Sequence, residues 1–194
     1  MPEEAFQNEE VRKSGFFKEL IKFSLIAFLI VVPFRYFVAQ PFIVNGASMD
    51  PTFHTGEYLI VDQLSYRAFD NPQRGEIVIF RYPKDPSKFF IKRIVGLPGE
   101  TIEMRENIIT IFNDEYPSGF SIKENYIIHT KNDILKVELE EDEFFVLGDN
   151  RASSSDSRIW GPLKQEFIVG RPIIRLFPLN RIQLFPGDYS EAHI

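Results

Sequence analysis

The pattern of hydrophobic and polar residues changes near residue 40. Before that point, one apolar run covers Phe23–Phe34 with Ser24 as its only polar member, and apolar residues resume after Arg35. Beyond it, short runs rich in Ile, Val, Phe and Tyr alternate with Pro, Gly and Asp. The first pattern predicts a single helix, and the second predicts short strands joined by turns.

The N-terminal apolar run is shorter than the roughly 20 residues that a membrane-spanning helix needs. Extended to about 20–39 it reaches that length, with Lys22 and Arg35 near its ends, where long cationic side chains can reach the interface. A cleaved signal peptide is an alternative, but cuts after Ala39 or Ala47 fit poorly, because Phe37 and Asn45 occupy the third position before them. A buried helix of a soluble core, the second alternative, would carry more polar residues. We therefore predict a transmembrane anchor.

Basic residues give this anchor a direction. Arg12, Lys13, Lys18 and Lys22 precede the apolar run, whereas no Lys or Arg occurs between Tyr36 and Tyr66. Because cytoplasmic flanks are enriched in basic residues, we expect a single-pass protein of the cytoplasmic (inner) membrane. The expected organisation is a short cytoplasmic tail over 1–17, the anchor over 18–39 and an extracytoplasmic β-rich domain over 40–194.

The pattern after residue 40 predicts a mainly β domain, a coiled, partly closed antiparallel sheet with hairpins. Turn signals such as Leu97-Pro98-Gly99 separate its strands. The expected strands are Tyr58–Asp62, Glu76–Tyr82, Phe89–Val95, Thr101–Met104, Ile108–Phe112, Ile134–Glu138, Glu143–Leu147 and Ile173–Phe177.

Composition removes several classes of function. The net charge of −6 argues against nucleic-acid binding. The absence of cysteine excludes disulfides, thiolate zinc sites and cysteine nucleophiles. The three histidines, His54, His129 and His193, have no metal-ligand spacing. We expect neither a metal nor a cofactor.

A first candidate cluster is Asn45–Thr52, which follows an apolar segment. Gly46 and Ala47 leave the backbone uncrowded beside Ser48, as a nucleophile requires when neighbouring N–H groups must approach a substrate carbonyl oxygen. An ordinary turn, in which Ser48 bonds its own backbone, is the alternative.

A second candidate is Lys92. On a strand, Phe90, Lys92 and Ile94 share one face. Apolar neighbours would desolvate the ammonium and lower its pKa, as a lysine that serves as a base at neutral pH requires. The alternative is a solvated lysine on an edge strand. Adjacent Arg93 is expected to form a structural ion pair.

A third cluster, Gly148–Arg158, follows an apolar strand and is crowded with short polar residues. Asp156 and Arg158 can pair locally, and serine hydroxyls can orient a nearby ammonium. The alternative is a solvated loop.

Taken in order, these clusters resemble the bacterial type I signal peptidases, a family of Ser/Lys endopeptidases. The matching stretches are Pro41–Thr52, Gly56–Val61, Arg74–Phe80, Ile91–Glu100 and Gly148–Arg158 followed by Gly161. The resemblance covers the anchor and nearly all of residues 40–175. It implies a β-rich catalytic domain outside the membrane, a lipid-bilayer anchor, and substrates that are exported preproteins with small residues at the first and third positions before the cut.

The resemblance also implies roles for individual residues. Ser48 would be the nucleophile, Lys92 the general base, and Ser154 the hydroxyl that helps orient the lysine. The supporting residues would be Asp149, Asp156 and Arg158.

Two features depart from some members of that family. Gly46 stands where some members carry a serine that helps to hold the oxyanion, so this support would come from the backbone. Larger members carry a long insertion between the lysine and the Gly148–Arg158 motif, whereas this chain has only a small β extension at about 103–142.

An extended substrate would pair with Phe42–Gly46, and Phe42, Val44 and Ile91 would line its shallow pockets.

Three other functions compete with this interpretation. A Ser-His-Asp enzyme could use His54 or His129, while His193 is too close to the C-terminus for a well-ordered base. A related Ser/Lys protease with a different substrate, such as a self-cleaving repressor, would lack the anchor. An inactive membrane-tethered binding module would not need both Ser48 and Lys92.

Overall fold

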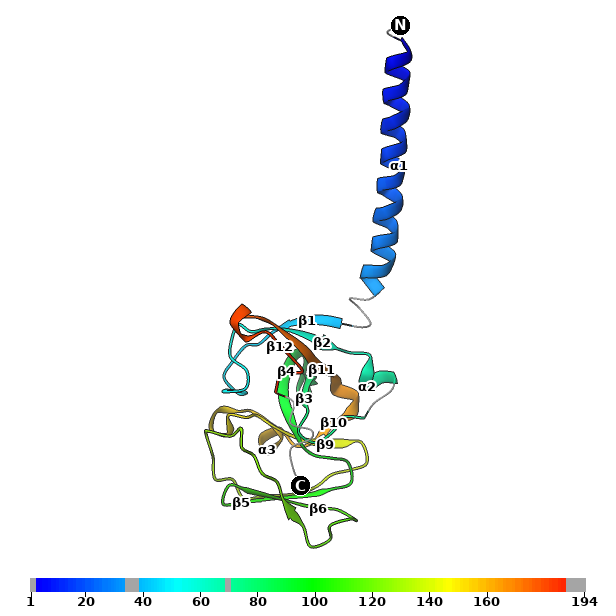
Figure 1. Cartoon of the computed structure of the whole chain (residues 1–194). Coiled ribbons are helices and arrows are strands. Elements are labelled where there is room, and N and C mark those ends of the chain that lie inside the picture. Colours follow the sequence, from blue (N-terminus) through cyan, green and yellow to red (C-terminus); the bar gives the residue numbers. More distant parts are fainter. Residues whose placement is uncertain (1–2, 34–38, 69–70, 188–194) are drawn as a thin grey trace. The chain divides into compact units, whose positions relative to one another are not determined.

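A computed structural model describes residues 3–33, 39–68 and 71–187 of the chain (Figure 1). The chain divides into two compact units, residues 1–39 and residues 40–194. The first unit contains one helix, and the second contains two β-sheets with short helical turns.

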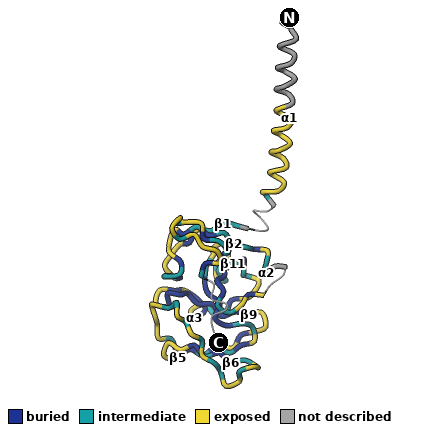
Figure 2. The backbone as a smooth tube through the Cα atoms, in the orientation of Figure 1, coloured by how far each residue is buried: buried dark blue, intermediate teal, exposed yellow. Residues whose placement is uncertain are grey.

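Helix α1 spans Glu3–Pro33. It therefore includes most of the segment 1–17, which we expected as a short tail, because that segment contains many good helix formers. The large apolar residues between Phe16 and Val31 are exposed, and Figure 2 colours the described lower part of this helix mostly as exposed. None of the helices in the described residues combines the length and the apolarity needed to cross a membrane. Part of the predicted anchor, residues 34–38, lies outside the described residues.

The second unit consists mainly of strands. Its helices α2 (Ser65–Ala68) and α3 (Ser157–Trp160) have four residues each. The strands are β1 (Ala39–Ile43), β2 (Tyr58–Asp62), β3 (Ile77–Tyr82), β4 (Asp85–Gly96), β5 (Thr101–Arg105), β6 (Ile108–Phe112), β7 (Phe120–Ser121), β8 (Leu135–Glu138), β9 (Glu143–Leu147), β10 (Leu163–Lys164), β11 (Ile168–Phe177) and β12 (Gln183–Leu184).

The strands form two sheets. The larger has the order β1-β2-β11-β3-β4-β9-β10 with β12 on β11, and the smaller has the order β7-β6-β5-β8. The pairings from β2 to β12 are antiparallel, which confirms the predicted mainly β, antiparallel class. The expected partial closure is wrong, because neither sheet closes within the described residues and β1 and β10 remain at opposite edges.

Most predicted strands are present, and two begin earlier than expected. Strand β4 begins at Asp85, because Asp85 already pairs with Tyr82 across a tight hairpin. Strand β11 begins at Ile168 and runs through Pro172. A proline is tolerated there because the pairing register with β2 shifts between Pro172 and Ile174.

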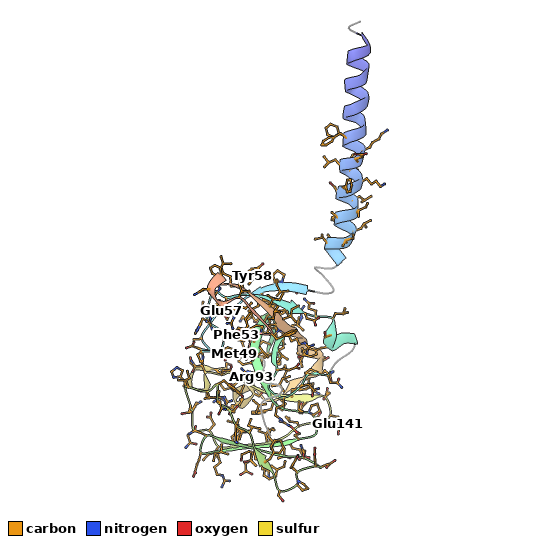
Figure 3. The ribbon with its side chains drawn as sticks, in the orientation of Figure 1. Met49, Phe53, Glu57, Tyr58, Arg93 and Glu141 are labelled. Atoms are coloured by element: carbon orange, nitrogen blue, oxygen red, sulfur yellow. The ribbon has the colours of Figure 1, made fainter. Side chains whose placement is uncertain are left out.

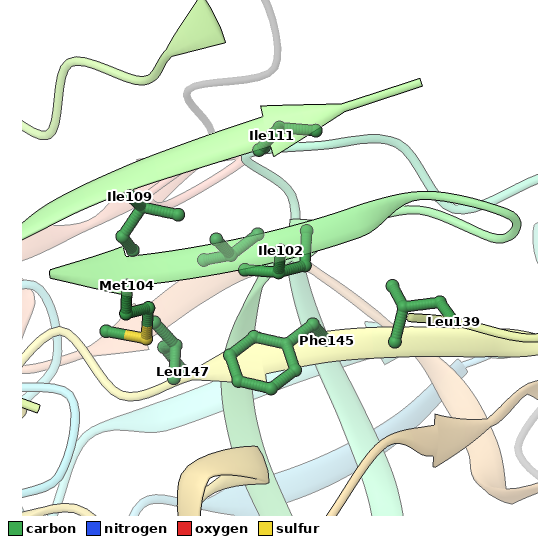
Figure 4. Close-up of a cluster of buried hydrophobic side chains, with 8 residues drawn as sticks. Ile102, Met104, Ile109, Ile111, Leu139, Phe145 and Leu147 are labelled. Atoms are coloured by element: carbon green, nitrogen blue, oxygen red, sulfur yellow. The ribbon is translucent and has the colours of Figure 1, made fainter. Parts of the chain in front are cut away.

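Three buried apolar clusters hold the sheets together. One lies between the smaller sheet and strands β4 and β9, and Figure 4 shows part of it. Its buried members are Val95, Ile102, Met104, Ile109, Ile111, Leu139, Phe145 and Leu147. The smaller sheet occupies most of the region predicted as a β extension, about 103–142, and this cluster packs it against the larger sheet.

A second cluster lies beneath the segment that carries Ser48. Met49 and Phe53 are buried in it, together with Val44 and residues of β2 and β3. Figure 3 labels Met49 and Phe53 inside the second unit. Burial of a side chain of this size contributes about 1.5–3 kcal/mol. These two side chains therefore fix the backbone on the C-terminal side of Ser48.

Candidate active site

Lys92 lies on strand β4, and its side chain contacts Ser48. Lys92 pairs in register with Val78 of β3, and its side chain is only 3% exposed. Its Nζ lies 2.7 Å from Ser48 Oγ, a hydrogen-bond distance, and it donates to the main-chain oxygen of Ile91 at 2.8 Å. The structure thus brings together the two residues predicted as nucleophile and base, although they are 44 positions apart in the sequence.

The surroundings of Lys92 favour its neutral form. Burial lowers the pKa of Lys92 to about 8, while the charges of Asp156 and Asp149 act in the opposite direction. The ring of Phe90, on the same strand, lies 5.4 Å from Nζ. The predicted direction of the pKa shift and its predicted cause, desolvation, are both confirmed. An amine with this pKa is substantially neutral at mildly alkaline pH.

The turn before Ser48 depends on Gly46. Its φ of +99° lies in the region that L-residues rarely adopt, so glycine is required for its backbone conformation. Thr55 Oγ1 accepts a hydrogen bond from the Gly46 N–H and donates one to the Gly46 carbonyl. The main-chain N–H of Ser48 makes no hydrogen bond within the described residues. It is therefore available to a substrate oxygen.

The 148–158 loop supports Ser48 from the other side. The Asn150 N–H donates to the Ser48 carbonyl at 3.0 Å. A Cβ on Gly148 would lie 2.4 Å from that same carbonyl oxygen and 2.2 Å from Ser154 Oγ. Only glycine at position 148 allows the backbone of this loop to approach the nucleophile so closely.

Asp149 forms a buried ion pair with Arg93. Two guanidinium nitrogens of Arg93 donate to the two carboxylate oxygens at 2.9 and 2.6 Å, and both side chains are almost completely buried. Thr52 Oγ1 also donates to the Asp149 carboxylate. Arg93 is thus the structural ion-pair partner that the sequence predicted, and Asp149 joins β4 to the segment after Ser48.

Asp156 and Arg158 form the predicted local pair. Nε and one Nη of Arg158 donate to the Asp156 carboxylate at 2.8 and 2.7 Å. Burial alone would raise the pKa of Asp156, but the bonds from Arg158 and the Gly148 N–H hold it below its usual value. Asp156 is therefore ionised, and its negative charge acts to raise the pKa of Lys92.

Ser154 lies beside this pair with its hydroxyl buried. The hydroxyl has no well-aligned hydrogen bond in the described part of the chain, although it is near enough to Asp156 to help lower the pKa of that carboxyl. The contacts of Lys92 given above do not include Ser154. Its predicted role in orienting the lysine stays a prediction.

A cleft of about 450 Å³ opens above Ser48 and Lys92. Phe42, Val44 and Ile91, the residues expected to contact substrate, are all in its lining. The complete lining is Phe42–Ser48, Leu59, Ile79, Lys88–Lys92, Ser153 and Ser155. A groove lined by both apolar and polar residues, with Ser48 and Lys92 among them, suits an extended peptide chain.

Several residues of the site escaped the sequence analysis. Phe89 packs edge-to-face on Phe42 with ring centroids 5.2 Å apart, and Lys88 and Ser155 also line the cleft. Thr52 was within a matching stretch, and its bond to Asp149 gives it a structural reason to be there. Sequence position alone could not indicate which residues of β4 reach across to β1.

Neither of the two described histidines, His54 and His129, forms a second candidate dyad with Ser48. His54 Nδ1 lies 2.6 Å from the Asp50 carboxylate on the surface, and His129 is exposed. His193 lies outside the described residues. The base candidate that contacts Ser48 in the described structure is Lys92.

Comparison with known proteins identifies the family to which this arrangement belongs. Residues 17–177 match the family model described as signal peptidase, peptidase S26. The chain belongs to this signal peptidase family. It is a serine-type endopeptidase.

Individual relatives agree with the family model. The chain is 36% identical over 174 residues to a probable signal peptidase I-1 of Synechocystis sp., covering 86% of this chain and 85% of that protein. It is 35% identical over 187 residues to signal peptidase I P of Bacillus subtilis subsp. natto, covering 91% and 97%. A crystal structure of a signal peptidase I from Enterococcus faecalis V583 is 31% identical, with 54% of this chain and 98% of that chain covered and a TM-score of 0.45.

Proposed function

We propose that this protein removes N-terminal signal peptides from exported preproteins, with Ser48 as nucleophile and Lys92 as general base. The observation that carries the proposal is the 2.7 Å contact between Lys92 Nζ and Ser48 Oγ, formed by a lysine whose pKa burial lowers to about 8. The choice of substrate is supported by relatives that are named signal peptidase I and that match this chain over most of their own length.

The reaction divides into two steps. In the first, neutral Lys92 accepts the Ser48 proton while Oγ attacks the scissile carbonyl carbon. The resulting ammonium returns the proton to the leaving amine, the peptide bond breaks, and the signal peptide remains as an ester on Ser48. In the second step, Lys92 takes a proton from water, the water oxygen attacks the ester, and the proton returns to Ser48 Oγ.

The oxyanion of each tetrahedral intermediate is held by the main chain. The Ser48 N–H is the donor we assign, since it has no partner within the described residues. The Gly46 N–H is already bonded to Thr55 Oγ1. One such donor can contribute about 3 kcal/mol to the stabilisation of the transition state, and the absence of a side chain at Gly46 leaves room for the substrate carbonyl.

Substrate specificity arises from the cleft between β1 and β4. The preprotein binds extended along Phe42–Gly46, at the edge of the larger sheet. Phe42, Val44 and Ile91 leave shallow depressions that accept only small side chains at the first and third positions before the cut. Ser154 supplies a second hydroxyl that helps to orient Lys92, with Asp149, Asp156 and Arg158 as supporting residues.

We further propose that the N-terminal segment anchors the enzyme in the cytoplasmic membrane, with residues 40–194 outside the cytoplasm. The exposed apolar side chains between Phe16 and Val31 support membrane attachment. A second exposed apolar group, near the end of β11 and in the segment that follows, also favours a position close to lipid. Its members are Phe177, Leu179, Ile182, Leu184 and Phe185. Resistance of the protein to alkaline extraction from isolated membranes tests the attachment; release into the supernatant contradicts it.

The substrate proposal is tested with purified full-length protein in detergent or lipid. A model preprotein is incubated with it, and mass spectrometry locates the cut. We expect one cut at the end of the signal peptide, after a small residue with another small residue two positions earlier. A matched preprotein with leucine at both positions is the control and should remain intact; cleavage after large residues contradicts the proposal.

A further inference from the structure

The segment 122–133 connects β7 to β8 and has no regular secondary structure. It contacts the loop at 148–158 through two ion pairs and reaches Arg93 of β4 through an aromatic ring. Each of these contacts ends on an arginine. Each of the three arginines in turn contacts a carboxylate or a main-chain oxygen of the 148–158 loop.

The first contact joins Glu124 to Arg151. Both Nη atoms of Arg151 donate to the Glu124 carboxylate, and both side chains are nearly buried. The Nε atom of Arg151 donates to the Gly148 carbonyl at 3.1 Å. Glu124 is therefore two contacts away from the glycine that allows the loop to approach Ser48.

The second contact joins Tyr126 to Arg93. The Arg93 guanidinium carbon lies 4.0 Å from the centroid of the Tyr126 ring, and the Tyr126 hydroxyl donates to Glu124 at 2.8 Å. Burial raises the pKa of Tyr126 well above its ordinary value, so the phenol stays neutral and can donate. Arg93 holds Asp149 in a two-bond ion pair, so Tyr126 covers the guanidinium that fixes this carboxylate.

The third contact joins Asp133 to Arg158. An Nη atom of Arg158 donates to the Asp133 carboxylate at 2.6 Å while other nitrogens of the same side chain hold Asp156. Lys131, which is exposed, also lies 3.4 Å from Asp133. Arg158 is therefore held between one carboxylate of the 122–133 segment and one of the loop.

We propose that residues 122–133 form a positioning strap for the active site, in which Glu124, Tyr126 and Asp133 hold the three arginines that fix the 148–158 loop against Ser48 and Lys92. This inference rests on the proposed Ser48/Lys92 chemistry. None of the strap residues lines the substrate cleft. The strap therefore does not touch bound substrate directly, and its effect on the reaction passes through the loop.

The consequences of releasing the strap can be derived from the contacts. The Asn150 N–H would no longer be fixed on the Ser48 carbonyl, and Asp149 and Asp156 would lie farther from Lys92. The first change misaligns the nucleophile, and a displacement on the order of 1 Å can cost as much as 100-fold in rate. The second removes negative charge near Lys92 and so makes its ammonium form less favourable.

The test compares two single-substitution variants of the full-length protein, Asp133→Asn and Glu124→Gln. A third variant, Asp114→Asn, is the matched control. Asp114 is an exposed acid of the same extension and has no ion pair in the described structure. Steady-state cleavage of a model preprotein gives kcat and KM. We expect kcat to fall about tenfold in Glu124→Gln and less in Asp133→Asn, whose side chain is partly exposed. KM should change little in either variant, and the control should match the parent.

The pH dependence separates positioning from a loss of folded protein. The charged groups that act on Lys92 are Asp156 and Asp149. Asp156 is paired with Arg158, and Asp149 is paired with Arg93. Weakening their influence lowers the pKa of Lys92, so the acid limb of the kcat profile moves to lower pH in both variants. A protein that is only partly folded loses amplitude at every pH without moving the limb. Fluorescence of the single tryptophan, Trp160, reports the folded fraction.

Three outcomes are possible for this experiment. A lower kcat with a shifted acid limb, after correction for folded protein, supports the strap. A parent-like kcat, or a loss of kcat with an unmoved acid limb, overturns it while leaving the Ser48/Lys92 chemistry intact. Failure of the parent itself to cleave the preprotein would instead be a failure of the proposed function, and the inference would fall with it.

Discussion

The main-chain N–H of Asn150 donates a hydrogen bond to the main-chain carbonyl of Ser48 at 3.0 Å. This bond joins the nucleophile's own residue to the loop that carries Asp149 and Asp156. It forms only because position 148 has no side chain. The position of the Ser48 hydroxyl therefore depends on a contact between two backbones that are about a hundred residues apart in the sequence.

Gly148→Ala should inactivate the enzyme without unfolding it. The new Cβ would lie 2.4 Å from the Ser48 carbonyl oxygen, so the backbone must separate there and Ser48 must move. We expect the cleavage rate to fall by about 100-fold, measured as initial rate on a model preprotein. Ala152→Ser, which adds one heavy atom at an exposed position of the same loop, is the control and should cleave at the parent rate.

Asp149→Asn should strongly destabilise the catalytic domain. It leaves the buried guanidinium of Arg93 without its anionic partner, and loss of one member of a buried pair costs about 3–5 kcal/mol. Urea unfolding followed by fluorescence measures the change. The surface pair of Asp85 and Lys88 offers a control, because Asp85→Asn should leave the unfolding midpoint unchanged. Equal midpoints for the two variants would contradict a stabilising role for the buried pair.

Activity should increase with pH until Lys92 has lost its proton. Below a pH of about 8 the Lys92 ammonium cannot accept the Ser48 proton, and the rate should fall about tenfold per pH unit well below that value. The profile of kcat/KM on a peptide substrate without groups that titrate in this range measures the pKa in the free enzyme. An acid limb near pH 10, the ordinary lysine range, would show that burial does not tune Lys92.

Ser154→Ala should lower kcat and leave KM nearly unchanged. The Ser154 hydroxyl is buried beside Asp156, whereas Ser153 and Ser155 in the same loop are exposed. We expect a loss of about tenfold, within the range for one positioned hydrogen-bonding group. The matched variant is Ser153→Ala, which removes an exposed hydroxyl of the cleft lining and should lower the activity less than Ser154→Ala does. If the two variants lose activity equally, Ser154 has no special role among the three serines.

The local structure could be predicted from the sequence wherever a short apolar run ends at a turn residue. The bounds of β2, β6 and β9 agree with the prediction, and the burial of Lys92 followed from its apolar neighbours on β4. The predicted strand at Ile173–Phe177 lacks the first part of β11, which begins at Ile168 and runs through Pro172 at a register shift.

Long-range contacts could not be predicted in the same way. The contact between Ser48 and Lys92 was inferred from resemblance to a family, since nothing local in either segment points to the other. The partners of the loop arginines, Glu124 and Asp133, lie in the predicted β extension, and nothing in their local sequence indicates these contacts. The open edges of the larger sheet were missed for a similar reason, because closure depends on register shifts that accumulate over several strands.

The central claim is that Ser48 and Lys92 act together, and the most direct measurement is preprotein cleavage by full-length variants that keep the parent fold. We predict that Ser48→Ala and Lys92→Ala each lower the rate by at least about 10⁴-fold, while His54→Ala cleaves at the parent rate. Near-UV circular dichroism equal to that of the parent ensures that each variant is folded. Cleavage by folded Ser48→Ala or Lys92→Ala at the parent rate would contradict the Ser48/Lys92 mechanism.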